Sequence, residues 1–211
     1  QYISQGTNPA EHLKHIELAC QNGIDWVQLR LKNISEQEVL TTAQQAKQVT
    51  DKYKVKLVIN DHYQVAAAVN AHGVHLGKSD ARPMEARQAL GPHQIIGGTA
   101  NTLADCLDLA AQKVDYIGLG PFRFTTTKNN LSPVLGRQGY VEILEAFTPS
   151  IPIVAIGGIA PNDIPDLMST GISGIAISGT ITRDFEVIPT LKNTIHNALS
   201  TAGEKGNTHI I

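Results

Sequence analysis

The sequence has little cysteine and no long apolar run, and each shortage excludes a class of protein. Cys20 and Cys106 are the only cysteines among 211 residues and form no C-x-x-C pair. This disfavours a disulfide framework or a cysteine metal site and predicts two buried, reduced thiols in a cytoplasmic protein. No apolar run approaches the ~18 residues that would span a membrane. No signal-peptide pattern opens the chain at Gln1, and the sequence leaves the natural N-terminus open.

Charge is also sparse. Charged residues make up 17% of the chain and the formal net charge is −2, with no basic block or aromatic-interleaved stripe. We therefore expect no nucleic-acid partner. Hydrophobic residues reach 42%, which is enough for a sizeable core and argues against disorder.

Short apolar runs alternate with amphipathic segments at a repeat of about 25 residues, the spacing of βα units. The expected strands are residues 2–4, 26–31, 57–60, 73–76, 95–98, 116–120, 153–156 and 174–177. The expected helices are residues 9–23, 35–53, 63–70, 83–90, 102–113, 140–147, 161–170 and 187–199. Several strands are continuously apolar, as parallel strands buried on both faces are.

Eight such units predict one (β/α)8 barrel over residues 1–200, followed by a polar, flexible tail at 201–211. An open, doubly wound sheet is the alternative. The longest loop, residues 121–138, far exceeds the median of about 4–6 residues and is predicted to be a lid or binding loop.

Polar side chains follow the ends of the expected strands, and a barrel gathers these ends at one face. Asp61 follows the third strand and Asp80 the fourth. Two carboxylates without clustered His or Cys suit Mg²⁺ that carries a substrate phosphate. The alternative is that each aspartate caps the helix after it. His62 and His75 are expected to be structural or supporting.

Gln28, Arg30 and Lys32 alternate along the second expected strand and should share one face. Because burying an unpaired charge is costly, this face predicts an anion, and Arg and Lys together suit a diphosphate. An internal salt bridge to Asp61 is the alternative. Lys128, in the long loop, would be solvated if it acted alone.

Glycine-rich turns end the seventh and eighth expected strands, as Gly157-Gly158 and Ser178-Gly179. Phosphate sites after these two strands recur in barrels, where backbone amides receive the anion. The two turns therefore predict a second phosphate site.

These segments, in this order, resemble the thiamine phosphate synthase family over nearly the whole chain. The matching segments are VQLRLK at 27–32, IND at 59–61, GVHLG at 73–77, DYIGLGP at 115–121, TTTK at 125–128, IPIVAIGGI at 151–159 and IS at 177–178. The resemblance implies a (β/α)8 barrel that joins a pyrimidinylmethyl diphosphate to a thiazole ethyl phosphate and releases diphosphate. It also implies that the carbon–oxygen bond breaks first, so that the reaction needs no general base.

The resemblance assigns roles by position. The pyrimidine diphosphate would be held by Gln28, Arg30, Lys32, Asn60 and Lys128, with Thr99 nearby, and Arg30, Lys32 and Lys128 would be catalytic. Mg²⁺ would be bound by Asp61 and Asp80. The thiazole phosphate would be bound by Thr125, Thr127, Gly158, Ile177 and Ser178.

The chain departs from the family pattern at a few positions. Leu31 replaces a usual Glu, Asn101 a usual His and Arg123-Phe124 a usual Tyr-Pro, and His62 stands where a second acid is frequent. Residues 174–178 look one residue short. None of these changes removes a charge that the reaction needs.

Three other functions compete with this prediction. A thiazole tautomerase of the same fold would need a general base but no metal or diphosphate site. A non-catalytic phosphate binder and an unrelated phosphate-binding barrel are further alternatives. The expected partners are small molecules, with no membrane, and the sequence leaves the oligomeric state open, a homo-oligomer included.

Overall fold

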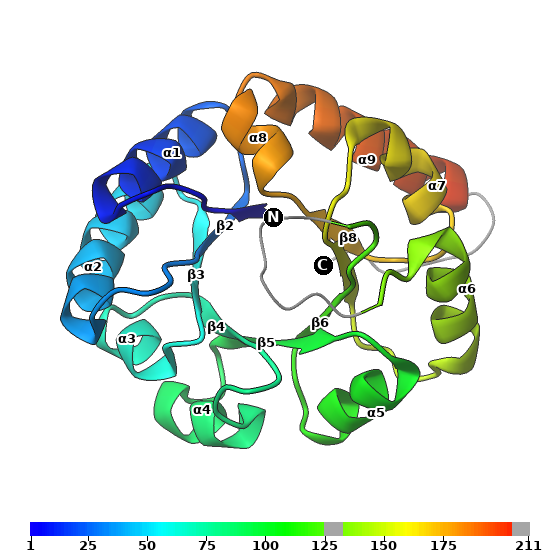
Figure 1. Ribbon diagram of the computed structural model, residues 1–211, viewed down its shortest axis with the longest axis horizontal. Coiled ribbons are helices and arrows are strands. Elements are labelled where there is room, and N and C mark those ends of the chain that lie inside the picture. Colours follow the sequence, from blue (N-terminus) through cyan, green and yellow to red (C-terminus); the bar gives the residue numbers. More distant parts are fainter. Residues whose placement is uncertain (125–132, 204–211) are drawn as a thin grey trace.

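The computed structural model describes residues 1–124 and 133–203 and contains a parallel eight-stranded sheet with helices around it. In Figure 1 the strands form a central ring, viewed end-on, and the helices surround it. The predicted (β/α)8 barrel is therefore confirmed. Thr125, Thr127 and Lys128 lie outside the described residues, as do residues 204–211.

The strands follow one another around the sheet in chain order, from β1 to β8, and each pairs in parallel with the next. Their bounds are β1 Tyr2–Ile3, β2 Trp26–Leu29, β3 Lys56–Asn60, β4 Gly73–Leu76, β5 Ile95–Ala100, β6 Tyr116–Leu119, β7 Ile153–Ile156 and β8 Gly174–Ala176. A parallel bridge between Tyr2 and Ile177 joins the first strand to the end of the eighth. The Ile3 N–H donates to the Ile177 carbonyl at 3.0 Å across this junction.

The helices separate successive strands, as right-handed βα crossovers require. Their bounds are α1 Pro9–Gln21, α2 Glu36–Lys52, α3 Tyr63–Ala68, α4 Pro83–Leu90, α5 Leu103–Ala111, α6 Gly136–Ala146, α7 Ile164–Met168, α8 Gly179–Arg183 and α9 Val187–Gly203, with a 3₁₀ turn at Pro161–Asp163. A capping box formed by Ser35 and Glu38 begins α2.

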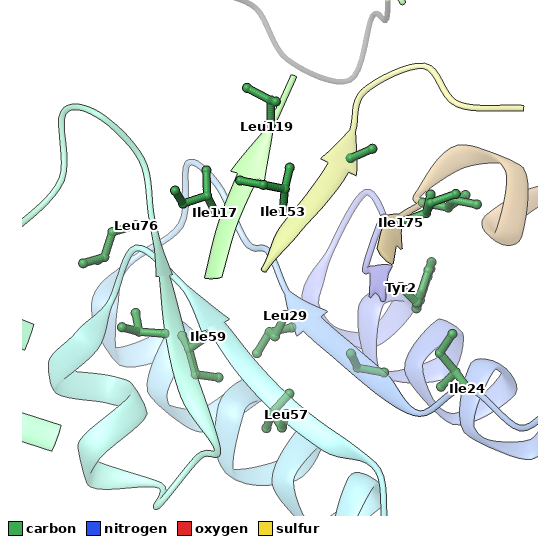
Figure 2. Packing of buried hydrophobic residues seen from close by; sticks show 14 of the residues in the cluster. Tyr2, Ile24, Leu29, Leu57, Ile59, Leu76, Ile117, Leu119, Ile153 and Ile175 are labelled. Atoms are coloured by element: carbon green, nitrogen blue, oxygen red, sulfur yellow. The ribbon is translucent and has the colours of Figure 1, made fainter. Parts of the chain in front are cut away.

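Alternate residues of the strands enter two separate clusters. Leu29, Leu57 and Ile117 belong to the large cluster between the sheet and the helices, part of which Figure 2 shows. Tyr116 and Val154 belong instead to a small cluster that fills the inside of the barrel. This alternation is the packing expected of a closed barrel and leaves the carboxyl ends of the strands free for polar groups.

Most boundaries lie within two residues of the sequence prediction, and the larger differences are in the second half of the chain. Helix α6 begins at Gly136 rather than at residue 140, which shortens the loop after β6. The segment expected as one helix at 161–170 is a 3₁₀ turn followed by the short α7. Helix α8 was not predicted, because its β-branched sequence GTITR has no helical periodicity. Helix α9 reaches Gly203, inside the expected tail.

Both cysteines are free thiols and buried in helices, as predicted. Burial raises the pKa of Cys20 to about 12 and that of Cys106 to about 11, so both thiols are protonated and unreactive at neutral pH. Among residues 1–124 and 133–203, no helix combines the length and the apolar character that a membrane span requires.

Candidate active site

A cavity of about 820 Å³ lies at the carboxyl ends of the strands. It is lined by all of the predicted site residues that the structure describes: Gln28, Arg30, Lys32, Asn60, Asp61, Asp80, Thr99, Gly158, Ile177 and Ser178. Its size falls in the upper part of the range for small-molecule sites, about 300–1,000 Å³. The cavity is therefore large enough for two small substrates side by side.

The basic side chains after β2 line this cavity, but they lie on a loop and not on the strand face that the sequence predicts. Strand β2 ends at Leu29, so Arg30 and Lys32 follow the strand instead of lying on its face. Its partner β1 is only two residues long and ends at Ile3, which pairs with Gln28. The Arg30 N–H donates instead to the Ser4 hydroxyl at 3.0 Å. Gln28 remains in the strand and is 2% exposed.

Asp61 and Asp80 meet at one side of the cavity, and neither caps a helix. Asp80 accepts a hydrogen bond from the Gly77 N–H at 2.7 Å, and Asp61 forms an ion pair with Lys32. The salt bridge that the sequence left as an alternative is thus present. The Asp61 backbone has a φ of 65°, in the left-handed region that Asp and Asn tolerate better than most residues.

The two carboxyl groups are hydrogen-bonded to each other, and their pKa values move apart. Burial raises the pKa of Asp80, and the neighbouring Asp61 raises it further. Burial alone would raise the pKa of Asp61, but hydrogen bonds with Asp80 and Lys32 outweigh it, and that pKa lies below its ordinary value. Two carboxyl groups so close share a proton in the free protein, and a bound cation would stabilise both in the ionised form.

This pair fits Mg²⁺ by the chemistry of its donors. Among the described residues, no group of three or more His, Cys, Asp or Glu side chains is placed to hold a metal. Mg²⁺ does not require one, because it commonly takes one or two carboxylates and completes its shell with water and substrate phosphate.

Two further polar groups in the cavity, on Arg30 and Asn60, have no hydrogen-bond partner among the described residues. No hydrogen bond or ion pair involves the half-buried Arg30 guanidinium in the described part of the chain. Burial lowers its pKa, and Asp61 opposes that effect. The Asn60 Nδ2 is buried and likewise has no hydrogen-bond partner among the described residues. Because unpaired buried polar groups are unfavourable, both are suited to meet a polar ligand.

His75 supports this wall of the cavity from inside the barrel. Its Nδ1 is hydrogen-bonded to the Tyr116 hydroxyl at 2.8 Å and its Nε2 to the Thr99 hydroxyl at 2.9 Å. His75 is 6% exposed. These contacts fit the supporting role expected for His75, and they fix the rotamer of Thr99 at the cavity wall.

The loops after β6 and β7 lie tightly against each other at Gly157 and Gly158. Both glycines have left-handed backbones, with φ of 94° and 69°. Arg123, whose role the sequence left open, forms a two-pronged ion pair with Asp163 at 2.6 and 2.8 Å. It thereby ties the loop after β6 to the 3₁₀ turn after β7.

We expect Gly158→Ala to lower the free energy of unfolding by more than the ~1 kcal/mol minimum for a left-handed non-glycine residue. An added Cβ would lie 2.9 Å from the Arg123 Cβ, the Arg123 carbonyl oxygen and the Phe124 carbonyl oxygen. Gly171→Ala is the matched control, because Gly171 has a φ of 95° but no atom within 4 Å of its added Cβ. Denaturant unfolding of both variants measures the difference, and equal losses would contradict a close approach at Gly158.

Sequence reasoning missed several cavity-lining residues. Gln5 follows β1, Lys78 follows β4 and pairs with Asp105 at 2.6 Å, and Arg183 ends α8. Lys78 lies between Gly77 and Asp80, so its position directly after a strand could have predicted that it lines the cavity. Arg183 gave no such signal, because the short helix that carries it was not predicted.

A cavity with charged and polar side chains in its lining, at the carboxyl ends of eight parallel strands, defines the class of the molecule, a (β/α)8-barrel enzyme for small molecules. Residues 2–181 match the thiamine monophosphate synthase family. The thiamine-phosphate synthase of Flavobacterium johnsoniae is 48% identical over 189 residues, which cover 88% of this chain and 89% of the relative. That of Bacteroides fragilis is 47% identical over 184 residues, 86% of this chain and 90% of the relative.

A solved structure agrees with these relatives. The thiamine phosphate pyrophosphorylase of Pyrococcus furiosus superposes with a TM-score of 0.81 at 27% identity, over 94% of this chain and 96% of that one. The chain belongs to the thiamine monophosphate synthase family.

Proposed function

We propose that this chain is a thiamine-phosphate synthase that transfers a pyrimidinylmethyl group with the help of Mg²⁺. It joins 4-amino-2-methyl-5-pyrimidinylmethyl diphosphate to a thiazole ethyl phosphate and releases thiamine phosphate and diphosphate. The observation that carries the proposal is the cavity, in which Asp61, Asp80 and the Arg30 guanidinium meet in a member of this family. The buried, free thiols support a cytoplasmic location.

The chemistry follows from the charges in the cavity. The carbon–oxygen bond of the pyrimidine substrate breaks first, and its electron pair leaves with diphosphate. Arg30 and Lys32 stabilise the charge that grows on this leaving group, and the proposal gives Lys128 the same role. Asp61 and Asp80 would hold Mg²⁺, which when bound neutralises part of that charge. Lys32 is paired with Asp61 in the free protein and would turn to the diphosphate when Asp61 binds the metal.

The second step needs positioning rather than proton transfer. The thiazole nitrogen attacks the pyrimidine methyl cation with its own lone pair, so no general base is required. Gly158, Ile177 and Ser178, with Thr125 and Thr127, would hold the thiazole phosphate and so orient the nitrogen. The Ser178 Oγ is buried without a hydrogen-bond partner among the described residues, which suits a donor to this phosphate.

Removal of the metal should abolish the reaction. We expect thiamine phosphate and diphosphate to form together with Mg²⁺ and neither to form with excess chelator, and activity to return when Mg²⁺ is restored. Chromatography of both products measures this. Undiminished product with chelator would exclude a metal role. Thiazole phosphate binding without product at any Mg²⁺ concentration would favour the tautomerase or the non-catalytic binder.

A further inference from the structure

The cavity has one cation that no acidic group balances in the described part of the chain. Four basic side chains line it there: Arg30, Lys32, Lys78 and Arg183. Lys32 pairs with Asp61 and Lys78 with Asp105, while Asp61 lies close enough to Arg30 to act on its pKa. Arg183 is an exposed residue at the rim of the cavity and has no ion pair or hydrogen bond to any described residue. Its charge is therefore available to a ligand.

The short helix that carries Arg183 is held in place from several sides. The Thr182 hydroxyl is hydrogen-bonded to the buried Tyr2 hydroxyl at 2.9 Å and donates to the Ser178 carbonyl oxygen at 3.2 Å. The Thr180 hydroxyl donates to the Ile159 carbonyl oxygen at 3.4 Å. Helix α8, orange in Figure 1, is thus anchored to β1 and to the loop after β7. This anchoring sets the position from which Arg183 acts.

Arg183 extends back along α8 toward the end of β8. Its Nη1 lies 3.2 Å from the point where a Cβ on Gly179 would be. Gly179 directly follows Ser178, whose hydroxyl is buried and unpaired among the described residues. An unbalanced guanidinium and an unpaired hydroxyl therefore border the cavity after β8, four strands around the sheet from β4, which Asp80 follows.

We propose that Arg183 binds the phosphate of the thiazole substrate and makes the enzyme select the phosphorylated thiazole over its free alcohol. This inference rests on the proposed function and deepens it. A guanidinium presents two N–H groups to two phosphate oxygens, so it recognises a phosphate dianion specifically. The free alcohol offers no such charge and gains nothing from Arg183.

The test is calorimetric binding of the thiazole ethyl phosphate and of the thiazole ethanol to the wild type and to Arg183→Gln. We expect Arg183→Gln to weaken phosphate binding about 10- to 100-fold, the factor for one charge-assisted hydrogen bond. Affinity for the alcohol should not change, and Arg183→Lys should restore part of the phosphate affinity. Arg137→Gln is the matched control, because Arg137 is an exposed residue of α6 that does not line the cavity.

Two results would overturn the proposal. One is unchanged phosphate binding by Arg183→Gln, and the other is an equal loss for phosphate and alcohol, which would indicate a merely structural role. Because the binding measurement does not need turnover, it tests the role of Arg183 even if the wild type forms no thiamine phosphate. The KM for the pyrimidine diphosphate is a second readout, which we expect Arg183→Gln to leave within about twofold, since the proposed function binds that substrate through other residues.

Discussion

Replacement of Asp61 by Asn should lower turnover at least ~100-fold at saturating Mg²⁺, the effect of removing one electrostatic stabiliser from an active site. The loss follows from charge, because Asn has nearly the same shape as Asp but is a poor ligand for a hard cation. It should also raise the Mg²⁺ concentration needed for half-maximal rate. Initial rates over a Mg²⁺ titration measure both effects.

Asn is the informative substitution because of the backbone at this position. Asp61 has a φ of 65°, and Asn adopts this left-handed conformation as readily as Asp does. Ala would add backbone strain to the loss of charge and confuse the two effects. Asp61→Asn therefore changes the metal site with the least change to the loop.

The control for Asp61→Asn is the same substitution on the outer surface. Asp51 is an exposed residue of α2 that pairs with Lys47, and neither residue lines the cavity. Asp51→Asn should retain wild-type rates, because an exposed pair of this kind contributes little to stability. Near-normal turnover of Asp61→Asn at saturating Mg²⁺, with Asp51→Asn also normal, would remove Asp61 from the metal site.

The barrel and the lining of its cavity could be predicted because both depend on short sequence patterns that mark where strands and helices begin and end. Strand β4, helix α4 and strand β7 have the residue bounds that the sequence predicts. Each is a short apolar run or a proline-started helix with clear turn residues beside it. Since a barrel brings every strand end to one face, residues as distant as Asn60 and Ser178 could be assigned to one cavity without any contact being known.

The contacts within the cavity could not be predicted in the same way. Arg30 lies after β2, and its N–H donates to the Ser4 hydroxyl, a side chain 26 residues away that no local pattern links to it. Asp61 pairs with Lys32, a residue 29 positions away on the loop after another strand. Periodicity carries no information on either point.

Charged side chains are arranged differently inside and outside the cavity. Outside the cavity, several charges are paired with opposite ones: Arg87 pairs with Asp115 at 2.5 Å and Lys192 with Asp25 at 2.8 Å. Inside the cavity, carboxylate lies against carboxylate and the Arg30 guanidinium has no described hydrogen-bond partner. Such an arrangement costs stability in the free protein and is expected where a charged ligand completes it.

Arg30→Met should therefore separate activity from stability. We expect turnover to fall about 100-fold, because the leaving diphosphate loses a desolvated cation, while the free energy of unfolding stays equal or rises. The reason is that the half-buried guanidinium has no described hydrogen bond or ion pair to lose, and burial already disfavours its charge. Met keeps most of the apolar stem of Arg and so preserves its packing. Initial rates and denaturant unfolding of the same preparation measure the two quantities.

Arg30→Lys completes this experiment, because it retains the charge but loses the planar fork that matches a diphosphate. We expect its turnover to lie between those of the wild type and Arg30→Met, with the larger change in the KM for the pyrimidine diphosphate. If Arg30→Met instead lost stability and activity together, Arg30 would be holding the loop after β2 rather than the substrate. A fall in activity alone would place the guanidinium at the diphosphate, where its cost to the free protein is offset only when substrate is bound.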